Sequence, residues 1–343
     1  MEISAQIEIL NARIINSNMN IFPNELLNGK MGICIYFYHI SQFLSNKEYY
    51  DYAERLLANI CDSVSNESCI DFNNGVSGIA WGIVHLYRKG FVTGNINAIL
   101  QDIDDVIFRT IHFSSLKDED KSRLHFLGIL LYYTDRYPTM KSRENKILME
   151  RTIIYILNHL EDNFHNEQWI QPKEFNISRN VLPLYLLALS RIYKLGLHRD
   201  KIIKIWESLS DIVLSTLPLS GANTTFFLLG LQSVLSCFEL SKWKERADWL
   251  STTIQPINII ETEFLDKEIS FGRGLAGYIW ILSLFSNNKL ITDLLKKKVL
   301  QKMEQSEIWG ERFNHESPSF FGNIGFFNGY TGVSYIYYWL LNY

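Results

Sequence analysis

The chain has 343 residues, of which 37 are acidic and 33 are basic, with 47% hydrophobic and 20% charged residues. This balance is typical of a well-mixed globular protein and argues against a disordered chain. A formal net charge of −4 provides no field that would attract a nucleic acid or an anionic membrane, so we expect neither as a partner. Charged or amide side chains interrupt every stretch before it reaches the ~18 apolar residues of a membrane span.

The N-terminal segment and the cysteines indicate the cellular compartment. The segment has no basic head followed by an apolar block and a small-residue cleavage site, so we expect a cytoplasmic protein. The four cysteines are too few and too scattered to form a disulfide framework, and we expect reduced thiols. They are Cys34, Cys61, Cys69 and Cys237.

Taken in chain order, the predicted elements are helices of two alternating kinds. Amphipathic helices, each with an apolar stripe at helical spacing, are predicted at 3–16, 47–64, 96–113, 144–160, 199–217, 240–253 and 289–305. The segments between them are apolar nearly all round, which is typical of buried helices. Few windows alternate with the period of a strand, so the sequence predicts no substantial sheet.

Each apolar segment follows a short step related to G-x-x-G, and these steps reveal an internal repeat. Their first positions are Gly29, Gly75, His125, Asn180, Phe227, Gly274 and Gly329, at spacings of 46 to 55 residues. Four copies keep both glycines, and the other three are degenerate. The sequence therefore predicts an all-α fold, an α/α toroid (barrel) of seven inner and seven outer helices, forming a single domain over residues 1–343.

In such a toroid every inner helix begins at the same end, so the helix N-termini surround one mouth of a central cavity. Residues just before each step are then expected to face a shared pocket. The predicted mouth residues are Asn28, Asp71, Asn73, Asn74, Leu124, His125, Arg179, Thr225, Phe226, Arg273 and Asn328.

The repeated steps, together with segments 71–78, 272–277 and 325–332, resemble those of the lanthionine synthetase C-like (LanC-like) proteins. The resemblance spans essentially the whole chain and implies an α/α toroid. In the family's cyclases it implies a zinc ion that activates a Cys thiol of a precursor peptide for addition to a dehydrated Ser or Thr. It implies, as partners, that precursor peptide and a dehydratase or other peptide-modifying enzyme.

The zinc ligands of the cyclases have no counterpart in this sequence. The Cys of repeat five maps to Thr225, and the Cys-His pair of repeat six maps to Gly272 and Arg273. None of these side chains binds zinc as Cys or His does, so no metal and no other cofactor is predicted here. The family's repeat-four His maps to Arg179, and the Tyr that follows the repeat-five Cys maps to Phe226.

Two residues are candidates for catalysis. Asp71 matches the repeat-two acid of the family, and His125 occupies the first position of repeat three. His315 belongs to the longest connection between helices, on the same predicted face. A constellation of His125, His315 and Asp71 is therefore one hypothesis, and solvent-exposed loop residues without a common role are the alternative.

The candidate substrate-binding residues are Arg179, Thr225, Phe226, Arg273, Asn328 and His315. The two arginines replace neutral or metal-binding groups, and a guanidinium beside helix N-termini favours an anion. The alternative is that each arginine pairs with a carboxylate, Asp71 or Glu268, and only stabilises a degenerate pocket.

These observations favour a LanC-like protein that binds a peptide in the cavity during lanthipeptide-type maturation, without zinc-dependent cyclase activity. One alternative is an active cyclase that uses displaced ligands or a zinc-independent mechanism. Another is an (α/α)-barrel glycosidase, which needs a second carboxylate about 5–10 Å from Asp71. The candidates for that second acid are Glu261, Glu263, Glu268, Glu311 and Glu316.

Overall fold

The computed structural model describes residues 3–64, 69–113, 119–164, 172–285, 290–310, 313 and 318–343, and no strand occurs among them. The predicted all-α class is confirmed. None of the helices in these ranges has the length and apolar character needed to cross a membrane.

Apolar helices are found in all seven predicted places. They are α2 (Lys30–Leu44), α4 (Val76–Arg88), α6 (Glu119–Arg136), α8 (Val181–Lys194), α11 (Gly221–Leu235), α14 (Leu275–Ser283) and α18 (Tyr330–Asn342). Among the residues whose burial is described, each is largely buried. In α2, for example, every residue from Lys30 to Ser41 is buried.

The amphipathic helices alternate with them as predicted. They are α1 (Ile3–Asn16), α3 (Lys47–Ser63), α5 (Ile96–Phe113), α7 (Arg143–Phe164), α9 (Arg199–Ser208) with α10 (Ser210–Ser215), α12 (Ser241–Thr253) with α13 (Pro256–Thr262), and α15 (Asp293–Glu304). The short helix α17 (Pro318–Phe321) and 3-10 turns at Met19–Ile21, Tyr137–Thr139, Ile177–Arg179 and Glu307–Trp309 were not predicted.

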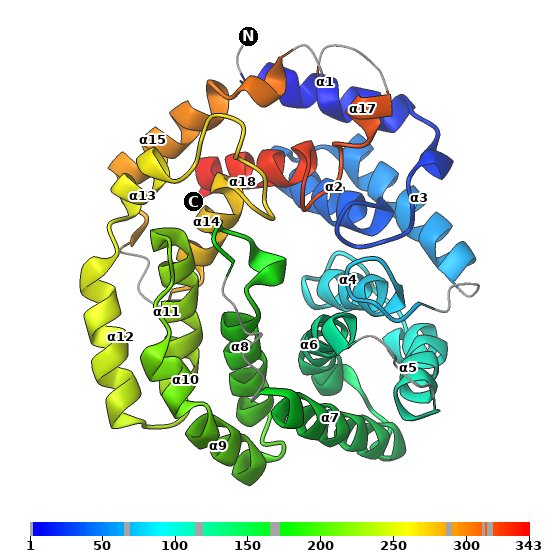
Figure 1. The fold of residues 1–343 in the computed structure, drawn as a ribbon. Helices are drawn as coiled ribbons and strands as arrows, with labels where there is room; N and C mark the ends of the chain where they lie inside the picture. The colour runs from blue at the N-terminus through cyan, green and yellow to red at the C-terminus, as the bar shows by residue number, and fades with distance from the viewer. Residues whose placement is uncertain are drawn as a thin grey trace. The chain divides into compact units, whose positions relative to one another are not determined.

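The chain divides into two compact units. Unit 1 comprises residues 1–64, 174–177 and 255–343, and unit 2 comprises residues 65–173 and 178–254. In unit 1, α14 packs on α18 and α18 packs on α2, so the last repeat contacts the first (Figure 1). In unit 2, α4, α6, α8 and α11 pack in succession. These contacts between successive repeats are compatible with the predicted α/α toroid.

The glycine steps are explained by the loop before each helix. We call residues 23–29, 69–75, 268–274 and 323–329 the pre-helix loops. Each ends on the glycine that precedes α2, α4, α14 or α18. The loop folds back on itself, and a Cβ on that glycine would lie only 2.0–2.3 Å from the carbonyl oxygen six residues earlier. Glycine is therefore required for close approach of the backbone rather than for a positive φ.

Backbone hydrogen bonds join neighbouring pre-helix loops in unit 1. The N–H of Phe327 donates to the carbonyl of Leu27 at 2.7 Å, and the N–H of Gly272 donates to the carbonyl of Phe327 at 2.6 Å. The N–H of Ile177 continues the series to the carbonyl of Gly272 at 3.0 Å. The three pre-helix loops of unit 1 thus share one register, because Leu27, Phe327 and Gly272 each lie two residues before the glycine that ends the loop.

The predicted starts of two helices are wrong. Helix α6 begins at Glu119, so His125 lies within the helix, and α11 begins at Gly221, well before Phe227. The side chain of Ser220 caps α11 by accepting the N–H of Asn223 at 3.2 Å. Both repeats lack a glycine at the first position of the step, so the helix can extend through it towards its N-terminus. Repeat four lacks it too, but Pro183 confines the start of α8 to Val181, because proline is tolerated in the first turn of a helix and not in its interior.

Replacing Gly274 with Ala tests whether the close approach of the loop backbone to this residue requires glycine. The new Cβ would lie 2.2 Å from the carbonyl oxygen of Glu268, and relief of this clash should lower the free energy of unfolding by about 3 kcal/mol. Gly90→Ala is the control, because nothing lies within 4 Å and only its φ of +76° disfavours alanine, at about 1 kcal/mol. Both variants are compared with the wild type by urea denaturation. If both lost the same free energy of unfolding, close approach of the backbone would not be the reason for glycine at position 274.

Candidate functional site

A hydrogen-bonded dyad of Asp71 and His125 lies at the start of α4 in unit 2. His125 Nε2 and Asp71 Oδ2 are 2.7 Å apart. The other carboxylate oxygen, Oδ1, accepts the backbone N–H groups of Asn73 at 2.8 Å and Asn74 at 2.7 Å. The structure thus brings together the two residues that the sequence singled out as catalytic candidates.

The position of the dyad follows from the packing of the pre-helix loop against α6. Phe72, next to Asp71, lies on Gly128, where a Cβ would be 2.2 Å from the Phe72 Cβ. Gly128 is three residues after His125, so the two share a face of α6. Because Gly128 has no side chain, α6 approaches the loop closely enough for His125 to reach Asp71.

The surroundings of Asp71 favour its charged form. Burial would raise the pKa of Asp71, but the hydrogen bond from His125 and the N–H groups of Asn74 and Asn73 together hold that pKa below its ordinary value. The side chains of His125 and Asp71 are 22% and 12% exposed. The dyad is therefore partly shielded from water but open to a ligand.

A second polar cluster lies between α4, α6 and α8 in unit 2. The indole Nε1 of Trp81 donates to Asp135 at 2.9 Å, and Arg88 and Arg191 pair with the same carboxylate. Phe72 contacts the ring of Trp81, with centroids 5.9 Å apart. The sequence analysis missed Asp135, because only its position on the packed face of α6 reveals its partners.

Thr225 and Phe226 do not reach the surface. Both are buried in α11, and the hydroxyl of Thr225 donates to the carbonyl of Gly221 at 2.8 Å. Their burial follows from the early start of α11, which places them within the helix rather than before it.

The two arginines among the predicted binding residues are exposed. Arg179, in unit 2, ends the 3-10 turn Ile177–Arg179, and Arg273 lies in a pre-helix loop of unit 1. Among the carboxylates considered as their partners, Asp71 contacts His125, and Glu268 accepts the N–H of Leu265 at 3.2 Å. His315 lies outside the described residues.

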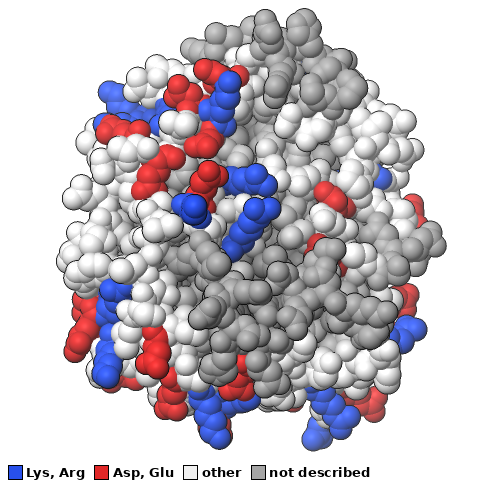
Figure 2. Space-filling model, viewed as in Figure 1, with Lys and Arg blue, Asp and Glu red and all other residues white. Residues whose placement is uncertain are grey.

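Asn328 lines a cavity in unit 1. This cavity has a volume of about 570 Å³ and lies between the pre-helix loops of repeats six and seven. Ser270, Asn323 and Asn328 provide polar groups, and an ion pair of Lys267 and Glu307 at 2.7 Å also lines it. On the face shown in Figure 2, lysine and arginine side chains are mixed with acidic ones.

The residues at the mapped zinc positions do not fit a zinc ion. The hydroxyl of Thr225 is bonded within its own helix, and Arg273 carries a cation. At Gly272 any side chain would meet the ring of Phe327, with a Cβ only 2.3 Å away. No group of three or more potential metal-ligating side chains occurs within the described part of the chain.

Comparison with models of known protein families finds a match to part of the chain. The family model described as lanthionine synthetase C-like protein matches residues 18–178, from before the first pre-helix loop to the 3-10 turn before α8. The matched range includes Asp71 and His125, whereas Thr225, Gly272 and Arg273 lie beyond it. No curated protein matches the sequence.

Replacing Asp71 with Asn should reduce stability in a pH-dependent way. Because its pKa is lowered in the folded protein, the stabilisation is complete above the ordinary value of about 3.9 and is lost as the pH falls below it. We expect a loss of about 1 kcal/mol at pH 7, which shrinks as the pH falls below 4, measured by urea denaturation.

The matched control for this substitution is Asp102→Asn on the exposed face of α5. A surface change of this kind should alter the free energy of unfolding by less than about 0.5 kcal/mol at pH 7. If Asp71→Asn lowered the free energy of unfolding equally at pH 3 and pH 7, the charge of Asp71 would not stabilise the fold.

Proposed function

Since the chain belongs to the lanthionine synthetase C-like family, we propose that it acts in the maturation of a ribosomally made, lanthipeptide-type precursor. The protein binds this peptide beside the pre-helix loops, with the segment to be modified at Asp71 and His125. A dehydratase or other modifying enzyme acts on the same peptide. The observation that carries the proposal is the 2.7 Å contact between His125 and Asp71, two polar side chains within the range that the family model matches.

The dyad has the chemistry of a general acid and base. The Nε2–H of neutral His125 donates to Asp71, which leaves the lone pair of Nδ1 to accept a proton. The carboxylate stabilises the imidazolium that forms. An imidazole held in this way favours proton transfer to and from a peptide ligand without a zinc ion.

This geometry favours a second candidate function, zinc-independent thioether formation. Nδ1 of His125 takes the proton of a cysteine thiol, and the sulfur bonds to the β-carbon of a dehydroalanine. The π electrons move onto the carbonyl to form an enolate. The proton on Nδ1 then returns to the α-carbon, so atoms and charges balance.

The glycosidase alternative receives less support. It requires a second carboxylate near Asp71, but among the described residues the groups that shift the pKa of Asp71 are His125, Asn74 and Asn73. Glu261 is paired with Lys298, and Glu311 and Glu316 lie outside the described residues.

Metal analysis tests the proposed absence of zinc. The positions at which cyclases hold zinc contain Thr225, Gly272 and Arg273, so protein purified in the presence of zinc should contain well under one equivalent. Measurement is by atomic emission on dialysed protein. Stoichiometric zinc that is lost in a His125→Ala variant would contradict the proposal and indicate displaced ligands.

A thiol-addition assay tests the role of the dyad. The probe is a synthetic peptide with one dehydroalanine and one cysteine, and ring closure is followed by mass spectrometry after thiol alkylation. In the presence of a chelator, His125→Ala should slow enzymatic closure about 100-fold, because general acid–base catalysis contributes at least that much. Arg88→Ala, outside the dyad, is the control.

The outcomes of this assay separate the two candidate functions. Closure by the wild type that needs His125 supports zinc-independent catalysis. Binding of the peptide without closure supports a peptide-binding partner alone. Closure that depends on added zinc, or that is unchanged in His125→Ala, would contradict the proposed role of the dyad.

A further inference from the structure

A second cavity, of about 680 Å³, lies in unit 2 where α4 and α6 end and α5 and α7 begin. The dyad is at the other end of α4, and thirteen helical residues correspond to about 20 Å. We call this cavity the amide groove, because side-chain carboxamides are prominent in its lining. They belong to Asn95, Asn97, Gln101 and Asn145.

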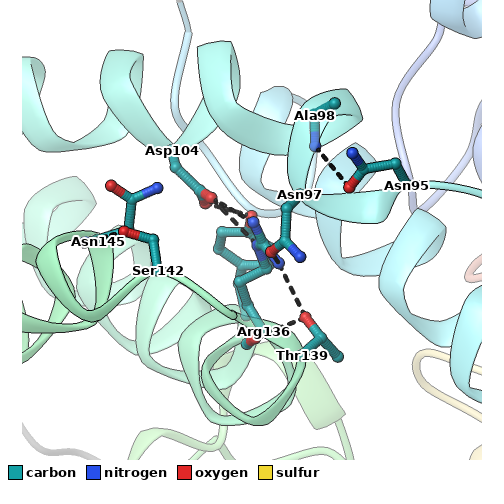
Figure 3. Close-up of polar contacts among 9 residues, drawn as sticks. Asn95, Asn97, Ala98, Asp104, Arg136, Thr139, Ser142 and Asn145 are labelled. Carbon is teal, nitrogen blue, oxygen red and sulfur yellow. Dashed lines mark hydrogen bonds and ion pairs between the residues drawn. The ribbon is translucent and has the colours of Figure 1, made fainter.

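A buried arginine fixes the shape of the amide groove. Arg136 is 1% exposed, and its Nε and Nη2 donate to Asp104 Oδ2 at 3.1 and 3.0 Å. Its Nη1 donates to Asn97 Oδ1 and Thr139 Oγ1, both at 2.9 Å (Figure 3). Asn97 and Thr139 both line the groove, so one guanidinium ties its two walls together.

The lining of the groove has a distinct chemistry. Lys141 is the only charged residue among the described lining residues, and it is exposed. The side chains of Ile96 and Met140 are buried and form an apolar floor. The groove therefore combines neutral hydrogen-bonding walls, an apolar floor and one cation.

We propose that the amide groove binds a peptide segment in an extended conformation, with alternating apolar side chains and an acidic group. A carboxamide donates and accepts at once, so those of Gln101 and Asn145 can pair with both the N–H and the C=O of a peptide group, while the oxygens of Asn97 and Asn95 already accept from Arg136 and Ala98. In an extended chain alternate side chains point the same way, which directs apolar ones onto Ile96 and Met140. Lys141 pairs with the acidic group.

Other ligand classes fit the groove less well. A nucleotide or another polyanion would need several cations, and Lys141 is the single one in the described lining. A wholly apolar ligand would leave the carboxamides without partners. The proposal is independent of catalysis at Asp71 and His125, because it uses different residues at the other end of α4.

The probe is the hexapeptide acetyl-Ser-Leu-Ser-Leu-Ser-Asp-amide, titrated into the full chain with backbone NMR detection. We expect shifts confined mainly to the amides of residues 94–101 and 139–145. The double variant Gln101→Ala, Asn145→Ala should weaken binding about tenfold or more. Lys141→Glu should weaken it several-fold at low salt, whereas Gln42→Ala, an exposed amide of α2, should not change it.

Two further probes isolate the recognised groups. A hexapeptide with N-methylated backbone amides keeps its side chains but loses its donors, and it should bind at least tenfold more weakly. A hexapeptide with Lys in place of Asp should lose the dependence on Lys141. Circular dichroism confirms that each variant is folded.

The proposal is overturned if the hexapeptide does not bind at millimolar concentration, or if its shifts map elsewhere. It is also overturned if the N-methylated hexapeptide binds equally well. The amide groove would be supported as a binding site separate from the dyad if groove variants lost hexapeptide binding and still catalysed ring closure of the dehydroalanine peptide through His125. If His125→Ala abolished ring closure but bound the hexapeptide normally, the result would support the amide groove as a site that does not depend on the dyad.

Discussion

The steric approach of a loop carbonyl to a helix-starting glycine is the constraint on which the rest of the structure depends. In each pre-helix loop the carbonyl oxygen lies where a Cβ of the glycine six residues later would be. The loop can therefore fold back tightly, and the residue after the glycine begins the helix by donating to that same carbonyl, as Val76 does to Cys69 at 2.9 Å. Because equivalent residues of the loops in unit 1 are also linked through their backbones, the spacing of the glycines sets the register of the repeats.

A similar close contact brings the two catalytic candidates, Asp71 and His125, together. In unit 2 the loop turns at Asp71, whose carboxylate accepts the N–H groups of the two asparagines that follow. Phe72 then packs against Gly128, which brings α6 and His125 to within hydrogen-bond distance of Asp71. Two small residues, Gly75 at the start of α4 and Gly128 within α6, thus bring an acid and an imidazole together without contributing any chemistry themselves. The hydrogen bond from His125 and the N–H groups of Asn74 and Asn73 lower the pKa of Asp71 despite its burial, so the carboxylate remains charged at neutral pH.

Much of the fold could be predicted because the signals are local. The apolar and amphipathic periodicities predicted both sets of helices, and the four complete glycine steps predicted where α2, α4, α14 and α18 begin. The starts of α6 and α11 could not be predicted from spacing alone, because the degenerate steps lack the glycine that ends a loop. The pairing of Asp71 with His125 was one hypothesis among others, since it depends on the contact of Phe72 with Gly128 between distant segments. The amide groove was missed entirely, because no sequence pattern shows that Arg136 ties Asn97 to Thr139.

The central claim is that close packing of the pre-helix loop on Gly128 holds His125 against Asp71. It is tested most directly by NMR titration of the Asp71 carboxyl carbon in the wild type and in a Gly128→Ala variant, under conditions in which both are folded. We expect the wild-type midpoint to lie below that of an ordinary aspartate, and the midpoint of the variant to move back towards about 3.9 as the loop is pushed from α6. The same midpoint in both proteins would contradict the account, because it would show that the dyad does not depend on this contact.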